Sequence, residues 1–282
     1  MALLYILTVV FTVAQSVTTK FYTKSYNNPY FYNALKAFFA TILMFLMNGL
    51  SIQFETTTFI LASIYGISLC ISMYSGYMAL KTGPMSLSSM LVSFSIIIPI
   101  LYGFIFCGES ITSLRIIGIC FLILAIILIN LNSKNNSGAK ISLKWAIFVL
   151  ITFLSNGICS VVQKKHQILY PGQYTEDFMF FSMLLCAVIY IFISLKKYPF
   201  KQLFKSKGKW LSILSTVTGT LANYLTLRLV GMENASVLFP VISAGTILTT
   251  VICGIILFKE RLKINQILAI ICGITAIVFL KL

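Results

Sequence analysis

The stretch Gly103-Phe-Ile-Phe-Cys-Gly-Glu109 recurs near the end of the chain as Gly254-Ile-Ile-Leu-Phe-Lys-Glu260. In both copies a glycine lies six residues before a glutamate, behind one long apolar run and ahead of another. The offset of 151 residues also aligns Ser95 with Thr246. This repetition predicts two related halves. A duplicated bundle of apolar helices is typical of transporters with a pathway between the halves.

The composition indicates a membrane protein. Of the 282 residues, 59% are hydrophobic and only 10% are charged, and the mean hydropathy is +0.98. About a quarter of the residues of a soluble domain are charged, so too few polar side chains remain here to cover a water-soluble globule. We therefore predict an all-α integral membrane protein. The net charge is +15, but the basic residues cluster between apolar runs, where they orient a membrane protein rather than bind nucleic acid.

About twenty apolar residues span the core of a bilayer, and the sequence contains ten such runs. They lie near residues 2–21, 30–49, 58–80, 84–107, 112–131, 144–163, 177–195, 211–230, 234–258 and 264–281. A polar stretch separates the first five runs from the second five. We predict two five-helix repeats, residues 1–131 and 144–282, joined by a linker loop at 132–143. Pro99 and Pro240 predict a kink or a break in the fourth and ninth runs.

The basic residues predict that the second half is inverted relative to the first. Five helices per half require this, and corresponding loops then face opposite sides of the membrane. The loop near residues 48–57 carries no Lys or Arg, whereas its counterpart near 196–209 carries six lysines. When Lys36 is counted with the first loop, 16 of the 21 basic residues fall on one face. The positive-inside rule then predicts that both termini are extracytoplasmic in a cell membrane.

The two Gly-to-Glu stretches resemble the EamA-type members of the drug/metabolite transporter superfamily. The turn Phe258-Lys-Glu-Arg-Leu262 is close to the family pattern, whereas Cys107-Gly-Glu-Ser-Ile111 lacks the basic residue after the glutamate. The resemblance implies ten transmembrane helices as two inverted five-helix repeats around a central cavity. Members export or exchange amino acids, other metabolites and drugs. Many are drawn with cytoplasmic termini. Because orientation varies in the family, we keep the orientation that the lysines predict.

None of the six acidic residues lies in the middle of an apolar run. An exporter that exchanges protons for cations normally needs a carboxylate inside the membrane. The small multidrug transporters, distant relatives by resemblance, carry such a glutamate in their first helix, where this chain has Ala14, Gln15 and Ser16. The sequence therefore favours a zwitterionic or anionic substrate, with amino acids first.

Polar residues inside or near the ends of apolar runs are the candidate substrate contacts. Lys36 lies about six residues inside the second run, where an ammonium either faces a cavity or snorkels to the interface. Asn33 is three residues earlier, on the same helical face. Tyrosines with polar tips suit either a wet cavity or an interfacial belt. The predicted substrate-binding residues are Lys36, Asn33, Gln15, Tyr74, Tyr77, Asn156, Asn223 and Tyr224.

Four further residues are candidates for gates or for structural roles at turns. Lys20 and Lys164 end the first helix of each half, as gate lysines or as interfacial anchors. Glu109 and Glu260 are either gates or carboxylates that cap the next helix. The only histidine, His166, is placed in a loop. The serines near 86–95 are assigned by default to helix packing.

We predict a secondary transporter, an exporter or exchanger, that works by alternating access of its two halves. Helices one to four and six to nine would line the cavity, and helices five and ten would support the bundle. The predicted partners are a small-molecule substrate and the lipid bilayer, without nucleic acid, metal or cofactor, in a monomer or homodimer. Two alternatives stay open: a multidrug or quaternary-cation exporter on the same fold, and a non-transporting integral membrane protein. No catalytic motif is present, so an enzyme is not predicted.

Overall fold

The computed structural model describes residues 2–26, 28–107, 112–130, 142–197, 208–232, 235–260, 262 and 264–281. These residues form helices and short connections, with no β-strand among them. The helices are α1 (Ala2–Ser25), α2 (Pro29–Met47), α3 (Thr56–Thr82), α4 (Met85–Ser93), η1 (Phe94–Ile96), α5 (Ile97–Cys107), α6 (Ser113–Asn130), α7 (Leu143–Leu169), α8 (Thr175–Lys197), α10 (Lys209–Met232), α11 (Ala235–Phe258) and α12 (Ile264–Lys281). Among the described residues, each of the ten apolar runs is therefore helical apart from a few positions at its ends.

The fourth run is one interrupted helix. A single 3-10 turn, η1, separates α4 from α5. Pro99 lies one turn beyond Ser95 and has no N–H group, so one hydrogen bond of a regular α-helix is missing there. The predicted break near Pro99 is thus confirmed. By contrast, α11 continues through Pro240.

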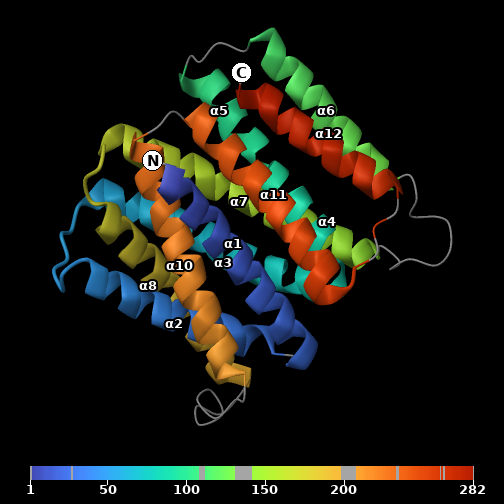
Figure 1. Cartoon of the computed structure of the whole chain (residues 1–282). Coiled ribbons are helices and arrows are strands. Elements are labelled where there is room, and N and C mark those ends of the chain that lie inside the picture. The colour runs from blue at the N-terminus through green and yellow to red at the C-terminus, as the bar shows by residue number, and fades with distance from the viewer. Residues whose placement is uncertain are drawn as a thin grey trace.

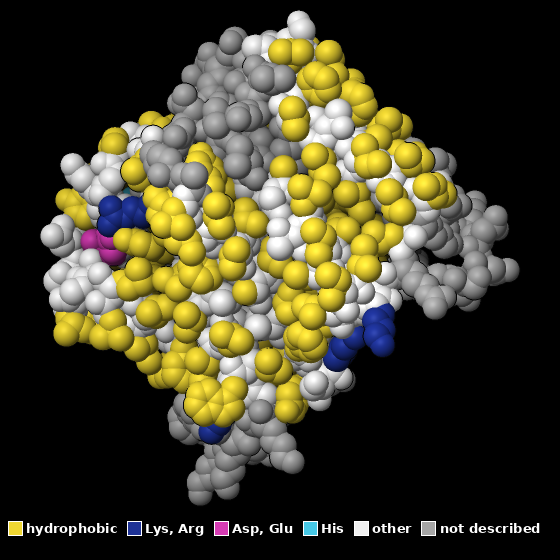
Figure 2. Space-filling model, in the orientation of Figure 1, with side chains coloured by type: hydrophobic (Ala, Val, Ile, Leu, Met, Phe, Trp, Pro, Cys, Tyr) yellow, Lys and Arg dark blue, Asp and Glu magenta, His cyan; other side chains and the backbone are white. Residues whose placement is uncertain are grey.

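The length and composition of the helices suit a bilayer. Six helical segments among the described residues are long and apolar enough to cross a membrane. They are Leu3–Ser25, Pro29–Met47, Thr56–Thr82, Met85–Gly103, Leu143–Leu169 and Thr175–Lys196. Many large apolar side chains face outward on these helices, and Figure 2 shows them spread over much of the described face, with basic groups near its edges. Such a surface is suited to lipid.

The helices pack in long pairs. Contacts are extensive between α1 and α10, between α3 and α7, and between α2 and α8. The pair α6 and α12 runs antiparallel at one edge of the bundle (Figure 1). Small residues bring this pair close: Ala125, Ala269 and Ala276 are fully buried. A Cβ atom at Gly273 would lie 2.7 Å from the ring of Phe94, so this glycine allows α12 to approach η1.

Polar side chains cap several helix starts. The side chain of Asn28 accepts a hydrogen bond from the Phe31 N–H at 3.0 Å, at the start of α2. Glu55 accepts from the N–H groups of Thr57 and Thr58 at 3.0 and 2.5 Å, at the start of α3. Desolvation opposes the charge of Glu55, but these N–H groups outweigh it and lower the pKa of the carboxyl to about 2. Glu55 thus caps its own helix.

Candidate functional site

A cavity of about 330 Å³ lies in the centre of the bundle. Its walls come from α1, α2, α3, α4 and η1 in the first half and from α7, α8, α10 and α11 in the second. None of its described lining belongs to α6 or α12, the pair at the edge (Figure 1). This division of roles agrees with the sequence prediction. The volume is at the lower end of the range for small-molecule sites, roughly 300–1,000 Å³.

The cavity is polar for a site in an apolar protein. Of the 37 described residues that line it, 17 carry a hydroxyl group and five a carboxamide. Lys36 is the only charged residue in this set. The hydroxyls and amides are placed on both halves of the chain. The site can therefore hold a polar ligand by hydrogen bonds, with a single positive charge to balance.

Lys36 and Asn33 lie one helical turn apart on α2, and both line the cavity. Asn33 is 1% exposed, and neither its side-chain nitrogen nor its side-chain oxygen has a hydrogen-bond partner among the described residues. A buried polar group without a partner costs about 1–3 kcal/mol. The unpaired amide makes the region of Asn33 and Lys36 a candidate for ligand contact.

Four other predicted contacts also line the cavity. The side chain of Gln15 lies against Gly219, where a Cβ atom would come within 2.6 Å of its amide carbon. Asn156 accepts a hydrogen bond from the Ser72 hydroxyl at 2.5 Å. Tyr77 donates to the carbonyl of Tyr26 at 3.1 Å, and Asn223 is part of the α10 wall. Six of the eight predicted residues are therefore brought together.

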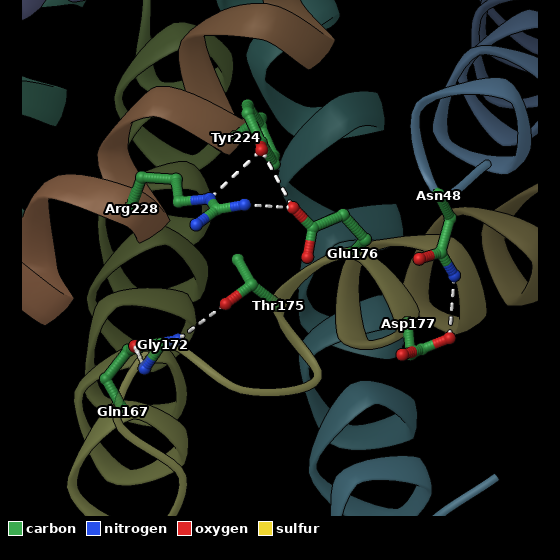
Figure 3. A network of polar contacts seen from close by, with 8 residues as sticks. All are labelled: Asn48, Gln167, Gly172, Thr175, Glu176, Asp177, Tyr224 and Arg228. Carbon is green, nitrogen blue, oxygen red and sulfur yellow. Dashed lines mark hydrogen bonds and ion pairs between the residues drawn. The ribbon is translucent and has the colours of Figure 1, made fainter. Parts of the chain in front are cut away.

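The other two predicted contacts, Tyr74 and Tyr224, are not among the residues that line the cavity. The ring of Tyr74 stacks on Tyr30, with 5.5 Å between the centroids. The Tyr224 hydroxyl donates to Glu176 Oε1 at 2.8 Å and accepts from Arg228 Nε at 3.0 Å (Figure 3). Arg228 also pairs directly with Glu176. Tyr224 thus joins α10 to the start of α8.

Sequence reasoning missed most of the hydroxyl lining. The serine-rich stretch that was assigned to packing supplies Ser88, Ser89, Ser93 and Ser95 to the cavity wall. The unusual density of serines in one apolar run was the available signal. The other missed polar residues of the lining are Thr12, Ser16, Thr19, Tyr32, Tyr65, Ser72, Thr152, Ser160, Gln163, Thr220, Thr226, Ser243 and Thr246.

One end of the bundle, where α1 and α11 end and α4 begins, is called the Lys20 end. The Lys20 ammonium donates to the carbonyls of Leu80 and Gly83, each at 2.5 Å. The Glu260 carboxylate accepts from the N–H groups of Met85 and Ser86 at 2.6 and 3.1 Å, and from the Ser86 hydroxyl at 2.5 Å. Glu260 therefore caps α4 in the other half.

This contact shows that the predicted capping role of Glu260 was assigned to the wrong helix. The sequence suggested that the carboxylate would cap the next helix, α12, but its hydrogen bonds go to residues about 175 positions away. Its equivalent by sequence repeat, Glu109, lies outside the described residues. A helix start attracts a carboxylate because its N–H groups are unpaired and its dipole is positive there. Glu260 exploits this attraction between the halves rather than within one.

The opposite end, where α7 and α10 end and α8 begins, is called the Lys164 end. Lys164 is 8% exposed on α7 and does not line the cavity. His166 was predicted in a loop, but it is fully buried within α7, which continues to Leu169. Asp177 accepts a hydrogen bond from the Asn48 side chain at 2.7 Å (Figure 3). It also accepts one from the Gln53 N–H at 2.9 Å. These contacts tie α8 to the segment between α2 and α3.

Comparisons with known proteins agree with this architecture. A family model described as "EamA-like transporter family" matches residues 1–131 and 143–282. A solved structure described only as "Crystal structure of protein" is similar over 98% of this chain and 94% of its own, with a TM-score of 0.64 and 13% identity. At that identity the likeness concerns the fold alone. No curated protein matches the sequence.

Proposed function

Since the chain belongs to the EamA-like transporter family, and is thus a multi-pass membrane protein, we propose that it is a secondary transporter of small organic metabolites. Amino acids and similar zwitterions or anions are the first class of substrate to test. The observation that carries the proposal is the cavity between the two halves, lined by many hydroxyl and amide side chains, with Lys36 and Asn33 in its wall. The protein would work as an exporter or exchanger.

The proposal includes two inverted five-helix repeats, residues 1–131 and 144–282. An inverted repeat predicts that each packed pair of helices has a counterpart with the halves exchanged. In chain order, α1 is equivalent to α7, α2 to α8 and α3 to α10. The packed pair α3–α7 therefore has the counterpart α10–α1, and the pair α3–α8 has the counterpart α10–α2. The pairs α2–α8 and α6–α12 are their own counterparts. This exchange pattern supports two related halves around a pseudo-two-fold axis, and the inversion itself rests on the five helices per half and the lysine distribution.

Transport would proceed by alternating access, in which the two halves rock around the cavity. Support comes from the polar contacts at both ends of the bundle. Glu260 joins the halves at the Lys20 end, and Asp177 joins them at the Lys164 end. Such hydrogen bonds can break and form as either end opens, so Lys20, Glu260 and Lys164 remain candidates for gating.

The orientation proposed from the lysines places both termini outside the cytoplasm of the cell, because 16 of the 21 basic residues fall on one predicted face. Fusion of a reporter that is active only in the cytoplasm to each terminus tests this. Activity at both termini would reverse the orientation while leaving the transport proposal intact.

The transport proposal is tested with purified protein in proteoliposomes. Vesicles loaded with an unlabelled metabolite mixture should accumulate a labelled member by exchange, and Lys36→Gln should abolish the accumulation. The exposed Lys165 on α7 provides the matched control, because Lys165→Gln removes an equal charge outside the cavity. Exchange of quaternary ammonium compounds alone would favour the multidrug exporter. No exchange with any solute class would favour a non-transporting protein.

A further inference from the structure

We infer that the substrate is a small organic anion with a net charge of −1 that also carries several hydrogen-bond donors. This inference rests on the proposed transport function and narrows its substrate class to anions, so that neutral zwitterions, including most amino acids, are expected to bind more weakly. It follows from three properties of the cavity wall: the single charge, the two unpartnered polar side chains, and the direction in which the hydroxyl groups donate.

The charge of the site sets the charge of the ligand. Lys36 is the only charged residue among those that the structure places on the cavity wall. An unbalanced charge at membrane depth is costly because the surroundings are apolar, and a partner of opposite charge removes that cost. A monoanion makes the occupied site neutral. A zwitterion leaves one positive charge in it, and a dianion leaves one negative charge.

Two orphaned polar groups indicate where the ligand is held. Asn33 offers two N–H donors and one acceptor oxygen beside Lys36; neither atom reaches hydrogen-bond geometry with a described residue, and the Tyr190 hydroxyl is a polar neighbour of the amide. Thr246 on α11 is 6% exposed, lines the same cavity, and likewise has no hydrogen-bond partner there. Asn33 and Lys36 together suit a carboxylate, since both can donate to its oxygens. Thr246 suits a hydroxyl at another part of the same ligand.

Four hydroxyl groups of the remaining wall offer acceptors to a ligand. Thr12, Ser16, Ser160 and Thr226 line the cavity, and each donates its hydroxyl proton to a carbonyl four residues earlier in its own helix, at 2.7–3.2 Å. A hydroxyl has one proton and two lone pairs, so these groups can only accept from a ligand. They belong to α1, α7 and α10. A ligand with donors at several positions satisfies them.

The test compares three six-carbon compounds of similar shape. Gluconate has charge −1, 2-amino-2-deoxygluconate is a zwitterion, and glucitol is uncharged. We expect gluconate to raise the melting temperature of the purified full-length protein, because a ligand that binds only the native state stabilises it. Its affinity should exceed that of the other two by about tenfold or more. Equal or tighter binding of the zwitterion, or no stabilisation by gluconate, would overturn the inference.

Variants of Lys36 and Asn33 test whether these residues cause the preference for gluconate over the other two compounds. Lys36→Gln should lower gluconate affinity about tenfold and abolish the preference for charge −1, and Lys36→Arg should retain that preference. Asn33→Ala should weaken gluconate binding while leaving the charge preference in place. The control Lys165→Gln should change neither. A charge preference that survives Lys36→Gln contradicts the inference.

Proteoliposome exchange separates this inference from the transport proposal. Lys36-dependent gluconate binding without any exchange supports the inference and refutes transport. Exchange that is confined to zwitterions or cations, and is unaffected by Lys36→Gln, supports transport and refutes the inference.

Discussion

Replacing Glu260 with alanine removes the carboxylate that caps α4 from the other half of the chain. Three donors lose their acceptor: the N–H groups of Met85 and Ser86 and the Ser86 hydroxyl. Hydrogen bonds to a charged group contribute about 1.5–3 kcal/mol each, and water replaces part of this at a half-exposed carboxylate. We expect Glu260→Ala to lower the free energy of unfolding by about 2–4 kcal/mol. Glu260→Gln keeps one acceptor oxygen and should cost about half as much.

Hydrogen exchange, followed by mass spectrometry on the protein in detergent, shows where the loss occurs. Glu260→Ala should speed exchange at the start of α4 and along the neighbouring ends of α1 and α11. The matched control is Asn28→Ala, which also removes a side-chain cap from a helix start, but within one half. Its effect should be about 1 kcal/mol and confined to the start of α2. Unchanged exchange at α4 in Glu260→Ala, or an equal spread in Asn28→Ala, would refute an inter-half role for Glu260.

Three further predictions concern the cavity and the packing. Asn33→Leu removes two polar groups that make no hydrogen bond, so it should raise the free energy of unfolding by about 1–2 kcal/mol in denaturant titration. It should also abolish substrate binding. A destabilised variant that still binds would contradict this. Gly66→Ala should lower the melting temperature, because its Cβ atom would lie 2.9 Å from a backbone oxygen of α8, at a cost of about 1–3 kcal/mol. The control Gly76→Ala places its Cβ atom no closer than 3.5 Å to any neighbour and should be neutral or stabilising. Arg228→Ala should cost no more than about 1 kcal/mol in the same assay, because its pairing with Glu176 is partly exposed; a larger loss would indicate a structural role for the pair.

Helix positions were predictable because the bilayer imposes one strong rule. Each crossing segment needs about twenty apolar residues, and the chain separates them with polar stretches. The break near Pro99 was visible for a similarly local reason, since proline removes a hydrogen bond wherever it stands. These features depend on residues that are neighbours in the sequence.

The site was only partly predictable. Lys36 and Asn33 could be found because a charge in an apolar run has few alternatives. The cavity serines could not be separated from packing serines, because a hydroxyl bonded to its own helix suits both surroundings. Tyr224 was misplaced because its partner Glu176 lies 48 residues away in the sequence. The partners of Glu260 are about 175 residues away, and no local pattern reveals such a pairing.

The lone charge of the cavity has an electrical consequence. On the proposed mechanism, the carrier loaded with a monoanion carries no net charge at the site, whereas the empty carrier carries Lys36 alone. The membrane voltage would then act on the empty return step, by about 2.3 kcal/mol per 100 mV for a charge that crosses the full field. One negative charge leaves the cell in each complete export cycle, so an inside-negative potential would by itself drive efflux without a coupled ion. Transport currents that reverse with the potential, carried by proteoliposomes with the anion on both sides, would make this visible.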